Sequence, residues 1–279
     1  MTGCELQGHR GARGLFAENT LEGFQRALAF GLDSIELDIA VTADDVAVVV
    51  HDPVLNIDLT RTADGAWLTR SGIAVRSLSY AALRAFDVGR ARPGSAAAQA
   101  HPAQMPFDGA RIPTLAEVFA ATAASGVRVD AELKTDPVTP GLTVSPDAMA
   151  QVVVDVATSS GALHRLAVRS FDWRGLATLR HTHPDIPLAW LTGRSSDEAT
   201  PERVAEAAWG CPYQPTWAPF YGMLDRGSLD RAHALGLRVV PWTVNAPMDM
   251  ARLIDWGVDG LCTDRPDLAL RLENFPSRA

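Results

Sequence analysis

Short apolar segments typical of strands alternate with segments of helical pattern along most of this chain, and this alternation limits the folds available to it. Strands that alternate with helices usually form a parallel sheet covered by those helices. About eight strand–helix units in 279 residues predict a TIM-type (β/α)8 barrel, with an open doubly wound sheet as the alternative. The expected strands cover residues 5–8, 34–40, 127–133, 166–170, 188–191, 213–217, 238–244 and 260–263.

The helices between these strands are marked by apolar periodicity and by residues typical of helix ends. Asn19 is predicted to cap the first helix, with Glu22 as its capping-box partner and Gly31 at its end. Later helices are expected at residues 115–124, 146–159, 176–181, 201–208, 228–234 and 247–256, and a last one after Pro266.

The stretch from residue 53 to residue 113 interrupts this alternation. It follows an apolar strand at 46–50, and it contains turns, one short expected helix at 79–86 and a loop-like stretch at 91–106 that is rich in Ala, Pro and Gln. We expect residues 1–279 to form a single barrel domain, within which residues 53–113 form a small inserted subdomain or lid.

The overall charge and the cysteine content exclude several classes of partner and site. A formal net charge of −8 without basic runs argues against nucleic acid or an acidic membrane as a partner. Cys4, Cys211 and Cys262 are too far apart to suggest a disulfide framework or a zinc site. No apolar run has transmembrane length and no signal peptide is present as given, so we expect a cytoplasmic protein; a removed signal would make it periplasmic or secreted. The sequence predicts no particular oligomeric state.

The expected strand at 34–40 carries acidic residues on one face. Glu36 and Asp38 share that face, while Ile35, Leu37 and Ile39 share the other. Two carboxylates about 6–7 Å apart repel each other by about 3 kcal/mol in a partly buried site. A divalent metal is the simplest cation to face this pair, although a solvated edge strand would carry the same pattern.

Further polar residues fall at the expected carboxyl ends of strands, where barrel enzymes place their catalytic groups. Glu132 and Lys134 share a strand face with Asp130, and His9 and His51 each follow a strand. Lys134 is also the only lysine among the 25 basic residues.

This combination of residues indicates metal-assisted cleavage of a phosphate ester. Carboxylate oxygens bind hard divalent cations, and histidines can act as acid–base catalysts. Arginine and lysine side chains can bind an anionic phosphate. The candidates are Glu36, Asp38 and Glu132 for the metal, His9 and His51 for acid–base catalysis, and Arg10 and Lys134 for the anion.

The motifs that carry these residues, taken in order over nearly the whole chain, resemble the glycerophosphodiester phosphodiesterase family. They are His9-Arg10-Gly11, Glu18-Asn19-Thr20, Glu36-x-Asp38, His51-Asp52, Glu132-x-Lys134, Ser170-Phe171, Trp242-Thr243-Val244-Asn245 and Gly257-Val258-Asp259-Gly260. The resemblance implies an α/β barrel with a small inserted subdomain after the second strand. It also implies that the candidates above have the roles given there, and that the metal is Ca²⁺ or Mg²⁺.

Other residues near these motifs have more than one interpretation. Phe171 and Trp242 are assigned to substrate binding, with a core position as the alternative for Trp242. Arg10 could simply pair with Glu18, and Asp264 is expected to cap the last helix.

The chain departs from the usual family pattern at three positions. Ala17 replaces a proline, Val46 replaces a glycine, and Arg169 replaces a glutamine. We expect Arg169 to add a cation near the site, which could alter the preferred alcohol group.

The expected function is hydrolysis of small-molecule glycerophosphodiesters to glycerol 3-phosphate and an alcohol. One histidine would activate the glycerol 2-hydroxyl for attack on phosphorus, the other would protonate the leaving alcohol, and water would open the resulting cyclic phosphate. The alternatives are a related lipid phosphodiesterase, of the lysophospholipase D or phosphoinositide type, and a non-catalytic barrel that binds phosphate esters.

Overall fold

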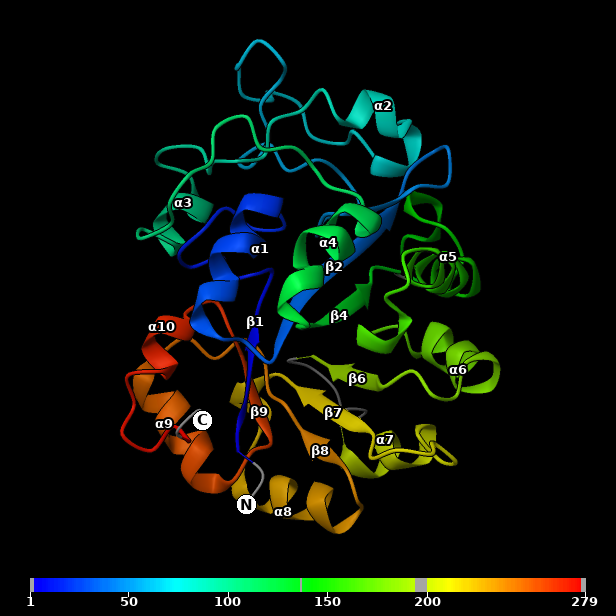
Figure 1. The fold of residues 1–279 in the computed structure, drawn as a ribbon, viewed down its shortest axis with the longest axis vertical. Coiled ribbons are helices and arrows are strands. Elements are labelled where there is room, and N and C mark those ends of the chain that lie inside the picture. Colours follow the sequence, from blue (N-terminus) through cyan, green and yellow to red (C-terminus); the bar gives the residue numbers. More distant parts are fainter. Residues whose placement is uncertain (1–2, 136, 194–199, 277–279) are drawn as a thin grey trace.

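The computed structural model describes residues 3–135, 137–193 and 200–276. These residues form a nearly closed barrel of parallel strands surrounded by helices (Figure 1). The strands pair in the order β8-β7-β6-β5-β4-β2-β1-β9. Consecutive barrel strands are therefore neighbours, and the last strand, β9, lies beside the first, which confirms the predicted barrel rather than the doubly wound sheet. Their bounds are β1 (Glu5–Gly8), β2 (Ser34–Val41), β4 (Arg128–Leu133), β5 (Leu166–Ser170), β6 (Leu188–Thr192), β7 (Thr216–Pro219), β8 (Arg238–Val239) and β9 (Gly260–Thr263).

The barrel closes between β8 and β9 through backbone hydrogen bonds. The Asp259 amide donates to the Val239 carbonyl at 2.9 Å, and the Cys262 amide donates to the Pro241 carbonyl at 3.1 Å. Pro241 has no amide hydrogen to donate, which limits the regular ladder here and leaves β8 shorter than the predicted strand at 238–244.

The helices cover the outside of the barrel, and the main apolar core lies between the two layers. Ile35, Leu37 and Ile39 of β2 are fully buried and belong to the same core as Phe24 and Phe119 from two of the helices. Because strand side chains alternate, this packing turns the acidic residues of β2 toward the barrel interior. The helices are α1 (Leu21–Ala27), α2 (Tyr80–Leu83), α3 (Ala96–Ala100), α4 (Leu115–Thr122), α5 (Pro146–Ser159), α6 (Trp173–Thr182), α7 (Pro201–Ala207), α8 (Arg226–Ala234), α9 (Pro247–Trp256) and α10 (Pro266–Ala269).

The cap of α1 is Thr20, so the prediction that Asn19 caps this helix is wrong. The Thr20 hydroxyl accepts a hydrogen bond from the Gly23 amide at 3.0 Å. Asn19 has a positive φ of 52°, and its side-chain amide donates to the Asp38 carboxylate at 2.9 Å. The Asn19 side chain therefore points to the barrel interior and does not cap the helix.

Residues 53–113 follow β3 (Ala47–Val49), which pairs antiparallel to β2 outside the barrel order. They lie at one end of the molecule, with α2 and α3 (Figure 1). Leu55, Leu68, Val75 and Leu83 are buried there in a small apolar cluster separate from the main core. That this stretch acts as a subdomain or lid stays a prediction.

Part of the stretch that we predicted to be loop is helical. Ser95 caps α3, because its hydroxyl accepts from the Ala98 amide at 3.2 Å, and alanine has the highest helix propensity of any residue. Beyond α3 the chain contacts the loop after β1. The Gln104 side chain donates to the Arg13 carbonyl and the Met105 amide donates to the Leu15 carbonyl, both at 2.7 Å.

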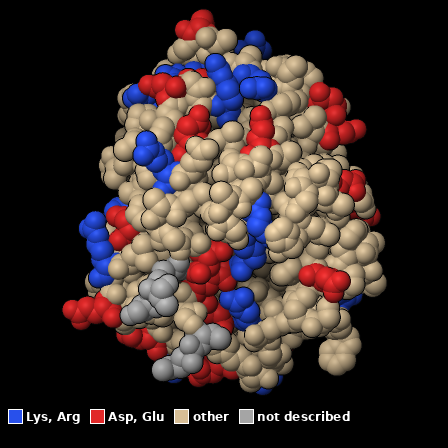
Figure 2. Space-filling view, in the orientation of Figure 1, with Lys and Arg blue, Asp and Glu red and all other residues tan. Residues whose placement is uncertain are grey.

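The surface carries charges of both signs. Figure 2 shows acidic and basic side chains interspersed over one face, without a broad patch of one sign among the coloured residues. Among the described residues, no helix combines the length and the apolar character needed to cross a membrane.

Candidate active site

A cavity of about 560 Å³ opens at the carboxyl ends of the barrel strands. Most residues that the sequence singled out line it, and they come from distant parts of the chain. The predicted residues among its lining are His9, Arg10, Glu36, His51, Glu132, Lys134, Phe171 and Trp242. Asp38 is not among the lining residues, but its carboxylate belongs to the acidic cluster at the cavity.

Glu36, Asp38 and Glu132 each offer a carboxylate oxygen, and these oxygens lie within 4.8 Å of one another. The register explains the grouping, because Asp38 of β2 is paired directly with Glu132 of β4. The exposed fractions of Glu36 and Asp38 are 1%, so neither charge is solvated by bulk water. Such a cluster requires cations nearby.

Burial and the neighbouring Asp38 carboxylate raise the pKa of Glu36 to about 8, and the Glu132 carboxylate adds to the rise. Burial alone would also raise the pKa of Asp38, but Arg10, His51 and Lys134 hold that pKa well below its ordinary value. The two shifts have opposite directions, so of these two carboxyl groups Glu36 holds a proton more readily than Asp38.

The cluster fits a hard divalent cation. Among the described residues, the buried Oδ1 of Asp38 has no hydrogen-bond partner, and Nζ of Lys134 lies 3.7 Å from it. A buried carboxylate oxygen without a donor, beside two further carboxylates, provides the oxygen ligands that Ca²⁺ or Mg²⁺ prefers.

His9 follows β1 and is held by Asp264, which follows β9. Its Nδ1 lies 2.6 Å from Oδ1 of Asp264, and its Nε2 lies 3.9 Å from Oε2 of Glu36. His9, together with Arg13 and Asn245, holds the pKa of Asp264 well below its ordinary value despite burial, so this carboxylate is ionised and accepts the Nδ1 proton. Burial lowers the pKa of His9, which leaves Nε2 as an unprotonated nitrogen.

Asp264 does not cap the last helix, so that prediction is wrong. The residue at the cap position of α10 is Arg265, which makes no side-chain cap. The Asp264 carboxylate also accepts hydrogen bonds from Arg13 Nε at 2.9 Å and from Asn245 Nδ2 at 2.7 Å. Sequence reasoning missed Asp264 and Asn245 as site residues, although both follow expected strands.

His51 lies just after β3 and is paired with its neighbour Asp52. Its Nδ1 is 2.6 Å from Oδ1 of Asp52, and Oδ2 of Asp52 accepts a hydrogen bond from Asn56 Nδ2 at 3.0 Å. About a third of the His51 side chain is exposed (33%). The structure therefore places two histidines in one cavity, each oriented through Nδ1 by a carboxylate.

Arg10 and Lys134 are two of the cations beside the acidic cluster. Arg10 pairs with Glu18 at 2.7 Å, as the structural alternative expected, but its Nε also lies 3.3 Å from Asp38. Lys134 Nζ lies 2.8 Å from Glu132. These carboxylates outweigh burial and raise the pKa of both cations, so both stay charged at the cavity.

The strands from β5 to β8 supply an aromatic part of the cavity. The centroid of the Trp242 ring lies 5.3 Å from that of the Phe171 ring and 5.7 Å from that of the Phe220 ring, and both contacts are edge to face. The Trp242 indole donates to the Ala218 carbonyl at 2.9 Å, which fixes its position. Apart from Arg169 of β5, the charged residues come from β2 and β4, from the loop after β1 and from the turn after β3, so one side of the cavity is mainly polar and another is aromatic.

A model of the glycerophosphoryl diester phosphodiesterase family matches residues 9–268. This chain belongs to that family. The family relatives include a glycerophosphodiester phosphodiesterase of Caldanaerobacter subterraneus, 27% identical over 95% of each chain. The resemblance inferred from the ordered motifs is thereby confirmed.

Solved structures agree with the family assignment. One from Silicibacter pomeroyi that carries the family's name superposes with a TM-score of 0.88 at 34% identity, covering 96% of this chain and 92% of that one. An Oleispira antarctica phosphodiesterase, in complex with the product sn-glycerol-3-phosphate, has the same fold, with a TM-score of 0.73 at 22% identity over 95% of this chain and 94% of that one.

Proposed function

We propose that this protein hydrolyses glycerophosphodiesters to glycerol 3-phosphate and an alcohol. The observation that carries the proposal is the meeting, in one cavity, of two carboxylate-oriented histidines, a buried carboxylate cluster and two cations. The product bound to the Oleispira antarctica phosphodiesterase of the same fold is consistent with this substrate class.

Arg10 and Lys134 would bind the phosphate of the substrate. Both are largely buried and charged, and an anionic ester in the cavity would meet them beside the carboxylates. Phe171 and Trp242 would contact the less polar part of the substrate, since their rings line the same cavity.

Glu36, Asp38 and Glu132 would hold one divalent cation, Ca²⁺ or Mg²⁺. When bound, such a cation would neutralise charge on the phosphate ester and favour ionisation of a hydroxyl group. Asn19 would orient the Asp38 carboxylate through its 2.9 Å hydrogen bond, and the Arg10 amide would orient Glu36.

His9 is the better candidate for the general base, because Asp264 accepts its Nδ1 proton and leaves Nε2 available to take another. Nε2 would take the proton of the glycerol 2-hydroxyl, whose oxygen then forms a bond to phosphorus. The bond from phosphorus to the leaving alcohol breaks, and His51 would give that oxygen a proton. Water then opens the cyclic phosphate, with the two proton transfers reversed.

Turnover of glycerophosphocholine tests this proposal against its alternatives. We expect hydrolysis that stops after exhaustive chelation with EDTA and returns with Ca²⁺ or Mg²⁺, and a decrease in kcat of about 10²–10⁴ in His9→Ala or His51→Ala. Faster turnover of lysophosphatidylcholine would favour the lipid phosphodiesterase. Binding of phosphate esters without turnover of either compound would favour the non-catalytic barrel.

A further inference from the structure

Arg169 is a buried cation that no carboxylate of the described residues holds through a hydrogen bond. Its exposed fraction is 3%. In the part of the chain that the structure describes, its Nε has no hydrogen-bond partner and its Nη1 contacts the Cys262 thiol at 3.9 Å. By contrast, the partly exposed Arg128 and Arg238 each donate to the Glu5 carboxylate.

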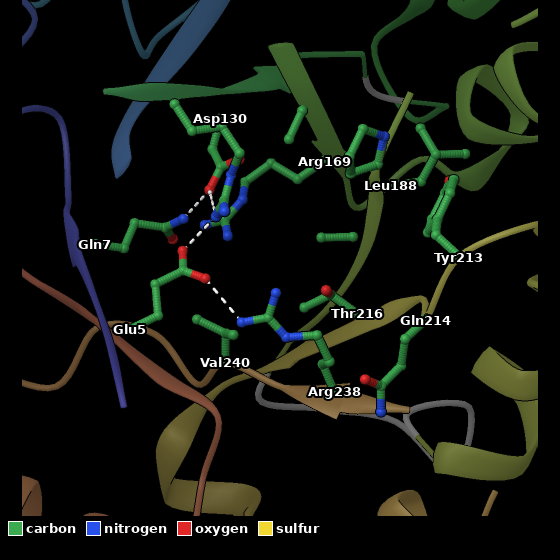
Figure 3. Close-up of a pocket in the computed structure, with 14 residues that line it drawn as sticks. Glu5, Gln7, Asp130, Arg169, Leu188, Tyr213, Gln214, Thr216, Arg238 and Val240 are labelled. Carbon is green, nitrogen blue, oxygen red and sulfur yellow. Dashed lines mark hydrogen bonds and ion pairs between the residues drawn. The ribbon is translucent and has the colours of Figure 1, made fainter. Parts of the chain in front are cut away.

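Arg169 lies directly beside the proposed metal site. It is on β5 and is paired in register with Glu132 of β4, and it lines the active-site cavity together with Glu36 and Glu132. It also lines a second cavity of about 280 Å³ toward the amino ends of the strands, where its side chain extends toward Asp130 and Gln7 (Figure 3). Its guanidinium is therefore close enough to Glu36, Glu132 and Asp130 to interact electrostatically with all three.

A guanidinium in this position cannot lose its charge at any physiological pH. Because it is buried, salt screens its field only weakly. The positive charge lowers the energy of the neighbouring carboxylates when no metal is present, and it repels a divalent ion that those carboxylates would bind. A divalent ion also feels twice the repulsion that a single proton feels, so loss of Arg169 would favour the metal over a proton at the same carboxylates.

We propose that Arg169 weakens the binding of the divalent cation at Glu36, Asp38 and Glu132, and so sets the metal affinity of this site. The proposal rests on the metal site of the proposed function. It assigns Arg169 a role in tuning the site and not in contacting the reacting atoms.

Isothermal titration of Ca²⁺ and of Mg²⁺ into metal-free protein, without substrate, tests this inference. We expect Arg169→Gln to bind the ions at least about tenfold more tightly than the wild type, which corresponds to removing one buried repulsive charge. Arg169→Lys keeps the charge and should remain close to the wild type. Arg165→Gln is the matched control, since Arg165 is also buried and near β5 but donates to the backbone carbonyls of Val127 and Phe119.

Equal or weaker metal binding by Arg169→Gln would overturn the inference, and Arg169→Met replaces that variant if a thermal melt shows that it does not fold. An equal gain in affinity in Arg165→Gln would also overturn it, because the effect would then be unspecific. Hydrolysis of glycerophosphocholine is measured separately. Tighter binding by Arg169→Gln in a protein without that activity would support the inference while refuting the proposed function.

Discussion

The proton-transfer role proposed for His9 depends on a single carboxylate. Asp264 accepts from Nδ1 of His9, from Arg13 and from Asn245, so three donors converge on it. This convergence keeps Asp264 ionised and fixes which nitrogen of His9 is protonated. His9 and Asp264 are 255 positions apart in the sequence, which is why an argument from local pattern assigned Asp264 to a helix cap.

Asp264→Asn should fold but lose most of its activity. An amide in place of the carboxylate can donate to Nδ1, which moves the proton of His9 to Nε2 and removes the base. We expect kcat on glycerophosphocholine to fall by about 10²–10⁴. Asp267→Asn is the control, because Asp267 pairs with Arg265 outside the cavity. Wild-type kcat in Asp264→Asn would contradict the role of this pair.

Lys134→Arg should also fold and lose activity, although it preserves the charge. Nζ of Lys134 lies 2.8 Å from Glu132 and 3.7 Å from Asp38, and its side chain is 17% exposed. The planar fork of arginine is larger and directs its donors differently than a compact ammonium. We expect kcat/KM to fall at least about tenfold, or some 1.4 kcal/mol, with saturating metal and an unchanged thermal melt. Wild-type kinetics would remove Lys134 from the site.

At the scale of elements, β2 determines both the core and the site. Its alternation places three apolar side chains against the helices and two carboxylates inside the barrel. In metal-free protein, burying these two neighbouring carboxylates lowers the stability of the fold once both are ionised. Glu36 has a pKa of about 8 in the folded protein and a reference value of 4.5. Because the folded state holds a proton that the unfolded state has lost, Glu36 contributes stability below about pH 4.5 that is lost as the pH rises toward 8.

The metal-free protein should therefore melt at a lower temperature at pH 8.5 than at pH 6, and added Ca²⁺ or Mg²⁺ should stabilise it more at pH 8.5. Glu36→Gln cannot ionise, so the part of the pH dependence due to Glu36 should disappear in this variant. Thermal melts with EDTA and with excess metal at the two pH values provide the measurement. An identical pH dependence in wild type and Glu36→Gln would show that Glu36 does not carry the proton.

The elements that could be predicted from sequence are those whose pattern has a single physical meaning. Period two along β2 and β4 places Glu36, Asp38 and Glu132 on inward faces, and the structure brings these three together. The predicted cap of α1 was wrong because the adjacent residues Asn19 and Thr20 are both good helix caps. Only the hydrogen bond from Asn19 to Asp38 decides that Thr20 is the cap. That contact is tertiary, and it has no local signature.

At the scale of the whole molecule, residues 53–113 contact the barrel at the loop after β1. The Gln104 side chain donates to the Arg13 carbonyl, the Met105 amide donates to the Leu15 carbonyl, and the rings of Phe16 and Phe107 are 6.2 Å apart. The same loop begins with His9 and Arg10. Residues 53–113 are thus in a position to hold the proposed general base and a proposed phosphate-binding cation in place from outside the barrel.

Gln104→Ala tests whether this contact matters for activity. The side chain is half-buried, and its loss removes one hydrogen bond to the loop after β1 without opening either apolar cluster. We expect kcat/KM to fall about tenfold, because small displacements of a catalytic group slow the reaction strongly, while the melting temperature changes little.

Gln99→Ala is a matched control in the same stretch, since the Gln99 side chain donates to the nearby Gly94 carbonyl. If both variants keep wild-type kinetics, the inserted stretch does not position the loop through Gln104. If both lose activity equally, the effect belongs to the stability of the inserted stretch and not to its contact with the barrel.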